Sequence, residues 1–119
     1  MSTSRPLQPS APTGTLSVAL AHAADLLATQ PQKAIEQARE ILKAVPTEPR
    51  AMLILGSALR RSGEHAAAQK TLTTLAAQQP KAAQVWLELG LVLATRGETK
   101  ESIASLTRST KLKADLVEA

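Results

Sequence analysis

The side chains that could do metal or nucleophilic chemistry in this chain are few and lie apart. His22 and His65 are the only histidines, and no second histidine or cysteine lies three or four residues from either of them. The chain has no cysteine, which excludes disulfides, thiolate metal ligands and cysteine nucleophiles. We therefore expect no metal site, and we interpret both histidines as residues of helix surfaces.

Carboxylates and hydroxyls are more frequent, but none of them stands in a catalytic pattern. Glu36 and Glu40 share one helix face with interleaved basic residues, which is typical of a solvated surface rather than of an acid–base pair. The glycines are isolated, so there is no phosphate-binding loop, and no serine stands in a nucleophile-elbow motif. The sequence predicts no catalytic residue and no cofactor site, and we expect that the chain is not itself an enzyme.

The composition limits both the fold classes and the kinds of partner that the chain can have. The chain has one tryptophan and no phenylalanine or tyrosine, so helix-forming residues far outnumber strand-forming ones. The net charge of +4 is spread along the chain, without the dense basic stripe of a nucleic-acid-binding protein. No apolar run approaches the roughly 18 residues of a membrane span, and the run near Leu16 is shorter than the roughly 7–15 residues of a signal peptide. We expect an all-α cytoplasmic protein that binds neither nucleic acid nor membranes.

The chain repeats itself at a fixed spacing of 34 residues. Gly56 and Gly63 recur as Gly90 and Gly97. The same shift relates Leu53 to Leu87, Leu55 to Leu89, Leu59 to Leu93, Leu72 to Leu106, and Pro46 to Pro80. Apolar residues recur at helical spacing on both sides of a glycine turn, which predicts two antiparallel helices in each unit. Gly56 and Gly90, inside the first helices, indicate that a second helix crosses closely enough to exclude a Cβ atom.

This repetition predicts an all-α, right-handed α-solenoid of three antiparallel helix pairs. The second and third pairs occupy residues 47–80 and 81–114, and residues 15–46 form a degenerate first pair that fits after a two-residue shift of its first helix. This shift makes the turn of the first pair two residues shorter and predicts four core residues: Leu20, Ala23, Ala24 and Leu27. In the third pair, Ser102 and Ser109 replace apolar residues, so its far end is expected to be less well packed. Residues 1–14 are expected to be a disordered leader. Residues 115–119 are interpreted as the start of a missing or truncated further helix. The last helix is therefore expected to fray, or to self-associate through an uncovered apolar face.

The motif Trp86-x-x-Leu89-Gly90-x-x-Leu93 resembles the consensus of the tetratricopeptide repeat, and so does the stretch 52–80. This resemblance covers residues 15–119. It implies a scaffold or adaptor without catalytic activity, whose partner is a protein or peptide ligand.

A narrower resemblance leads to an alternative function. The stretches 38–46, 53–63 and 89–94 are similar to repeats of the bacterial tetratricopeptide-containing sulfotransferases, in which the repeats precede a catalytic domain. This resemblance implies a docking or regulatory part of a larger enzyme, with a downstream domain of the same polypeptide as its partner. No residue here matches the phosphate-binding loop of those enzymes.

In tetratricopeptide folds the first helices of successive pairs line a concave groove, so the resemblance also implies where a partner binds. Seven residues are predicted to form this groove: Arg50, Leu53, Ser57, Arg60, Gln84, Leu87 and Leu91. The three leucines lie off the predicted core stripes Met52/Leu55/Leu59 and Trp86/Leu89/Leu93, which indicates a contact outside the fold. The two arginines would orient an acidic or carboxylate-bearing partner. The other hypothesis is a surface that stays solvated.

Overall fold

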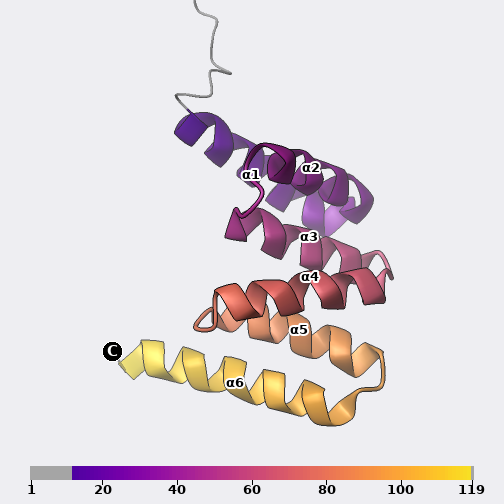
Figure 1. The fold of residues 1–119 in the computed structure, drawn as a ribbon, viewed down its shortest axis with the longest axis vertical. Helices are drawn as coiled ribbons and strands as arrows, with labels where there is room; N and C mark the ends of the chain where they lie inside the picture. The colour runs from indigo at the N-terminus through magenta and orange to yellow at the C-terminus, as the bar shows by residue number, and fades with distance from the viewer. Residues whose placement is uncertain (1–11, 119) are drawn as a thin grey trace, which may run out of the picture.

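The computed structural model describes residues 12–118, and this part of the chain forms six α-helices. Their bounds are α1 Pro12–Thr29, α2 Pro31–Ala44, α3 Pro49–Arg61, α4 His65–Gln78, α5 Ala83–Thr95 and α6 Thr99–Glu118. Each helix packs against the next one along the chain, and α3 also contacts α1 and α5. Figure 1 shows the helices stacked as three antiparallel pairs from the indigo end to the yellow end. The predicted all-α solenoid is confirmed.

Glycine sets the turns inside the second and third pairs. Gly63 and Gly97 have φ angles of 84° and 81°, a region that residues with a side chain enter only with strain. After Gly63, the amide of Glu64 donates to the carbonyl of Leu59 at 2.8 Å, which closes the helix end in a Schellman arrangement. The third pair repeats this arrangement after Gly97. The predicted glycine turns are confirmed.

The two glycines inside α3 and α5 lie where the helices of a pair cross. A Cβ atom on Gly56 would lie 2.5 Å from Cδ2 of Leu72, and one on Gly90 would lie 2.6 Å from Cδ2 of Leu106. Both distances are well below van der Waals contact. The predicted close crossings are therefore confirmed, and the repeated glycines have a packing reason.

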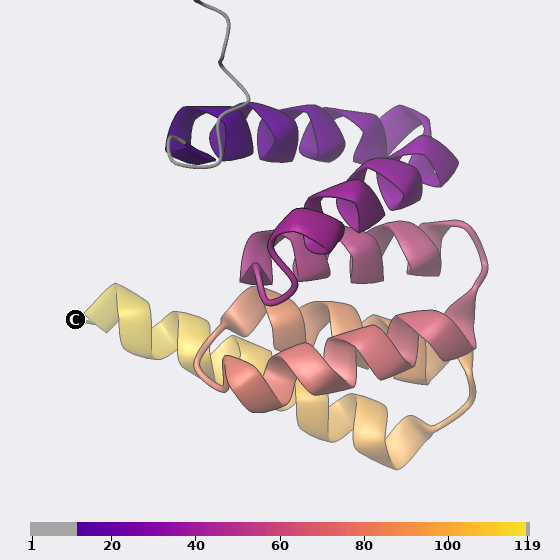
Figure 2. The same cartoon turned by 45° about the horizontal axis from the view of Figure 1, so that its top comes forward.

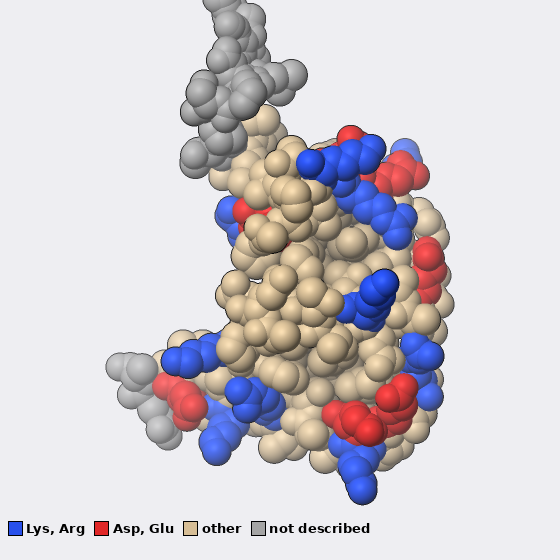
Figure 3. Space-filling model, in the orientation of Figure 1, with Lys and Arg blue, Asp and Glu red and all other residues tan. Residues whose placement is uncertain are grey.

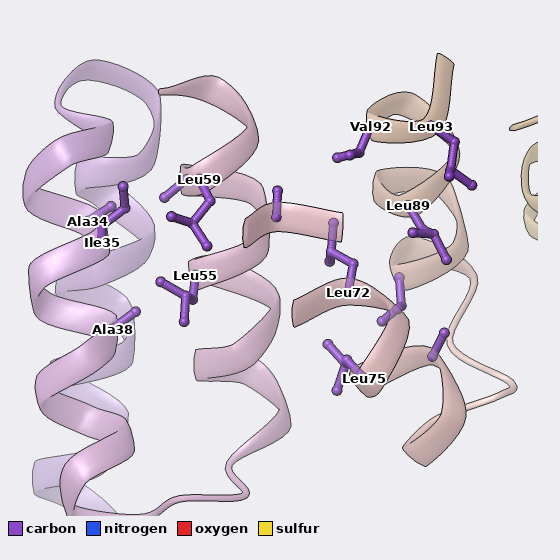
Figure 4. Close-up of a cluster of buried hydrophobic side chains, with 14 residues drawn as sticks. Ala34, Ile35, Ala38, Leu55, Leu59, Leu72, Leu75, Leu89, Val92 and Leu93 are labelled. Atoms are coloured by element: carbon purple, nitrogen blue, oxygen red, sulfur yellow. The ribbon is translucent and has the colours of Figure 1, made fainter. Parts of the chain in front are cut away.

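The core is continuous through the middle of the stack. Its largest fully buried side chains are Leu59, Leu72, Leu75 and Val92, from α3, α4 and α5. Figure 4 shows Leu59, Leu72 and Leu75 between buried residues of α2 and buried residues of α5, Val92 among them. Met52 and Trp86, which were predicted to lie on the core stripes, are only half-buried and pack against the edge of this cluster.

The first pair keeps part of the predicted pattern. Leu20 and Ala23 are buried, as the two-residue shift predicts, and Leu27 is half-buried against the core. Ala24, predicted to be a core residue, is exposed. Gln30 alone separates α1 from α2, which agrees with the predicted shorter turn.

Serine side chains join α6 to α5. We interpreted Ser102 and Ser109 as replacements of apolar residues that loosen the third pair, and that interpretation is wrong. Both are buried, and their hydroxyls donate at 2.8 Å to the carbonyl oxygens of Gly90 and Ala83. These bonds satisfy the buried hydroxyls and fix α6 along the length of α5.

Two predicted boundaries differ from the structure. Helix α1 begins at Pro12, inside the segment 1–14 predicted to be a disordered leader, because proline is well tolerated in the first turn of a helix. Residues 1–11 lie outside the described residues. At the other end, α6 continues through residues 115–118, which were predicted to start a further helix. Ala114 stands at the position of Pro46 and Pro80 in the earlier units, so nothing stops the helix there.

Candidate partner-binding groove

The predicted groove lies where α3 and α5, the first helices of two successive pairs, face each other. In Figure 2 α4 lies in front of α5. From α3, Ser57 Oγ donates to Glu88 Oε2 at 3.2 Å, and Arg60 Nε donates to Glu88 Oε1 at 2.8 Å. From α5, Gln84 Nε2 donates to Glu88 Oε2 at 3.5 Å. Three of the predicted groove residues therefore meet on one carboxylate.

The charge of this carboxylate is balanced by Arg60. The side chain of Glu88 is 7% exposed and that of Arg60 is 22% exposed. A buried carboxylate is stable only when it is paired and hydrogen-bonded, and Arg60, Ser57 and Gln84 meet that need. Ser57 is itself 2% exposed, so it is not part of the accessible surface. Arg60 was predicted to be available to an acidic partner, but the structure shows it paired with Glu88.

Glu88 is the residue of this site that the sequence prediction missed. It stands in the otherwise apolar run of α5, at the position that Ile54 has one repeat earlier. Ser57 and Arg60, one turn apart on the preceding first helix, are the matching polar residues. A charged residue inside an apolar helix face, with a basic residue on the adjacent helix, was the signal that could have identified it.

Arg50 is also paired, at the start of α3. Its backbone N–H donates to Glu48 Oε2 at 3.0 Å, and its side-chain Nε donates to the same oxygen at 3.1 Å. The side-chain hydrogen bond from Arg50 holds the pKa of Glu48 below its ordinary value, the backbone hydrogen bond and the charge of Arg50 act in the same direction, and burial opposes them. Arg50 remains 64% exposed while its carboxylate partner is buried.

The three groove leucines differ in their environments. Leu53 is half-buried and packs against the central core cluster, so the expectation that the fold does not need it is wrong. Leu87 and Leu91 are also half-buried, but they belong to neither core cluster of the described residues. They lie about one helical turn apart on α5, on either side of Glu88. They are the two predicted groove leucines that stay partly open to solvent outside the core clusters.

Two further findings concern chemistry and membranes. Among residues 12–118, no group of three or more histidine, aspartate or glutamate side chains is placed to hold a metal ion. No helix in this part of the chain is long and apolar enough to cross a membrane.

Comparison with protein families identifies the repeat. A family model described as "Tetratricopeptide repeat" matches residues 20–68 and 57–115, which together include most of the chain. The chain belongs to the tetratricopeptide repeat (TPR) family. Proteins of this family generally act as protein-interaction modules and are typically non-catalytic. No curated protein gives a significant match, and the expected link to sulfotransferases finds no support in these comparisons.

Solved structures share the TPR fold at low sequence identity. The type III secretion translocator chaperone SycD of Yersinia enterocolitica aligns with a TM-score of 0.78 and 18% identity, over 86% of this chain and 78% of that one. The TPR domain of Sgt2 from Aspergillus fumigatus aligns with a TM-score of 0.80 and 20% identity, over 87% of this chain and 69% of that one. A mutant of MamA aligns with a TM-score of 0.72 and 15% identity, over 87% of this chain and 79% of that one. At these identities the similarity establishes the fold alone.

Proposed function

We propose that this TPR chain is a non-catalytic interaction module whose groove between α3 and α5 binds an apolar segment of a partner protein, as a helix or as an extended peptide. The observation that supports this proposal is the pair Leu87 and Leu91. Both are partly open to solvent, lie about one turn apart on one helix, and are not needed by the core clusters.

The chemistry of the partner follows from the charges around these leucines. Arg60 is paired with Glu88, and Arg50 is paired with Glu48. A partner carboxylate would have to compete with these internal carboxylates for the arginines. We therefore propose an apolar partner segment, in place of the acidic one that the sequence alone favoured.

A downstream domain of the same polypeptide, such as a sulfotransferase domain, would use the same apolar surface. No contact or charge in the groove favours it over a separate protein. It is therefore the second reading of the same proposal.

The proposal is tested with a displayed peptide library selected on the wild-type chain. We expect the enriched peptides to carry apolar residues about one helical turn or two strand positions apart, because these match the leucine spacing. The double variant Leu87→Glu, Leu91→Glu should lose these peptides, because it places two carboxylates in the apolar part of the groove.

A matched control separates loss of binding from loss of folding. Ile103→Glu makes the same kind of change at a residue that is 60% exposed on α6, away from the proposed groove. This control should retain the peptides, and circular dichroism should show both variants helical. Peptides that bind the double variant as tightly as the wild type would overturn the proposal.

A further inference from the structure

The last helix extends beyond the helix it packs on. The hydroxyl of Ser109 donates to the carbonyl of Ala83, which is the first residue of α5. Helix α6 continues to Glu118, so its last residues run past the start of α5 for roughly 13 Å at about 1.5 Å per residue. Figure 1 shows this yellow end projecting beyond the loop that joins α4 to α5.

The overhang and this loop form a pocket that lies outside the groove. It has a volume of about 450 Å³ and is lined by Lys81 of the loop and by Arg108, Lys111, Leu112, Asp115 and Leu116 of α6. The five α6 residues follow one another at spacings of three, one, three and one, so they share one face of the helix. We call this site the overhang pocket.

The overhang pocket combines apolar surface with positive charge. Leu116 is 69% exposed and Leu112, one turn earlier, is half-buried. The pocket has three cationic side chains and one carboxylate, which gives a net charge of +2. Figure 3 shows basic and acidic side chains gathered at the lower left, where α6 projects.

None of the three cations of the pocket belongs to an ion pair of the described residues. The three ion pairs found among the described residues involve other side chains. Arg108 covers the ring of Trp86, with its guanidinium carbon 5.0 Å from the ring centre. Any ligand that reaches Arg108 therefore acts close to Trp86, which is the only tryptophan of the chain.

The internal repeat shows that this charge is specific to the last pair. A shift of 34 residues takes the three cations to uncharged residues of the preceding unit, Thr47, Thr74 and Ala77. The TPR fold itself therefore does not require basic residues at these positions. Their presence next to two accessible leucines points to a ligand.

We propose that the overhang pocket binds an acidic amphipathic helix of another protein, at a site separate from the groove. Leu112 and Leu116 form a ridge one turn apart, against which the apolar face of a second helix packs. Lys81, Arg108 and Lys111 bind carboxylates on the flank of that helix by charge-assisted hydrogen bonds. A second copy of this chain is a poor occupant, because a two-fold contact would bring a charge of +2 against another +2.

The test uses a capped helical peptide of about 14 residues, or four turns, with leucines on one face and glutamates on its flanks. When the peptide is added to the full chain, the Trp86 emission should change until the site is saturated. The affinity of the peptide should fall as the salt concentration is raised. The double variant Lys81→Glu, Lys111→Glu should bind the acidic peptide about tenfold or more weakly than the wild type does. It should bind a version of the peptide with lysines in place of glutamates more tightly than the acidic peptide. No emission change up to about 1 mM peptide would overturn the proposal.

Three controls locate the binding. Lys70→Glu with Lys100→Glu changes the net charge equally at exposed sites elsewhere and should leave the affinity near that of wild type. Leu87→Glu with Leu91→Glu should also keep it, which separates this proposal from the groove. Ala114→Pro should end α6 early, as Pro46 and Pro80 follow the ends of α2 and α4, and should abolish binding while the pairs stay helical.

A second copy as the occupant would give a different result. Sedimentation would then show dimers that Leu116→Glu dissociates, and the acidic peptide would have to compete with the dimer. That outcome, or equal binding by the Lys70/Lys100 and Lys81/Lys111 variants, would overturn the proposal.

Discussion

The ion pair between Arg60 and Glu88 determines how much charge the proposed groove exposes to a partner. Arg60 is the residue that sequence reasoning would offer to an acidic ligand, but its Nε lies 2.8 Å from a carboxylate oxygen of the buried Glu88. The pair cancels its own charge, and Ser57 and Gln84 fill the remaining hydrogen-bonding capacity of the carboxylate. In the proposed groove, the leucines on either side of Glu88 therefore supply the accessible apolar surface.

Removing only one partner of this pair should destabilise the fold. We expect Glu88→Leu to lower the free energy of unfolding by about 1–3 kcal/mol, because Arg60 loses its carboxylate while it is only partly open to water. The double variant Arg60→Met, Glu88→Leu should recover most of that loss, since two apolar side chains replace the pair. Urea denaturation of wild type, both single variants and the double variant measures the coupling. A double variant as unstable as the sum of the single losses would contradict this account.

Glu48 should make the stability of α3 depend on pH. Its pKa is lowered in the folded chain, chiefly by the Arg50 side chain. The contribution of ionised Glu48 to the free energy of unfolding is therefore fully present above the ordinary glutamate pKa. It is lost as the pH falls through the lowered pKa of the folded chain. Glu48→Gln should cost about 0.5–1 kcal/mol near neutral pH, and nothing once the carboxylate of the wild type is protonated.

Denaturation at neutral and acidic pH tests this expectation. Glu36→Gln, at an exposed position on α2, is the control and should stay within about 0.5 kcal/mol of wild type at neutral pH. A Glu48→Gln deficit that persists unchanged in acid would show that the carboxylate charge is not its cause.

The helices themselves were largely predictable, because glycine and proline mark their ends. Gly63 and Gly97 correctly predicted two turns, and the repeated leucines predicted the helices on either side of each turn. The serines of α6 were misread, because a hydroxyl that bonds a backbone carbonyl on another helix leaves no periodic trace in the sequence. Glu88 does interrupt an apolar helix face, but its partners on α3 are 28 and 31 residues away along the chain, so helical periodicity does not identify them.

The crossing of α5 and α6 should be intolerant of a side chain at Gly90. A Cβ atom there would meet both Leu106 Cδ2 and Leu106 Cγ, at 2.6 and 2.7 Å. We expect Gly90→Val to lower the free energy of unfolding by roughly 1–3 kcal/mol through overpacking. Thermal unfolding measures the loss. Because the obstacle is one side chain, Gly90→Ala with Leu106→Ala should be more stable than the two single losses predict, and strict additivity would refute the steric explanation.

On the scale of the whole molecule, basic and acidic side chains are interspersed over the face shown in Figure 3. A diffuse net charge of +4 can release few counterions from DNA. We expect binding to a labelled duplex to be weak, independent of sequence, and lost between about 50 and 200 mM salt. Fluorescence anisotropy measures this, and sequence-specific binding that persists in salt would contradict the expectation that the chain binds no nucleic acid.

The described helices touch only their neighbours in the stack: no contact joins helices further apart than α1 to α3 or α3 to α5. Under tension such a molecule should open helix by helix and not as a single unit, because each helix is stabilised only by its neighbours. The α5–α6 pair is clamped by its buried serines, while α1 is held only by α2 and α3. Stretched between its ends, the chain should therefore peel open from α1 and keep the tryptophan end intact the longest.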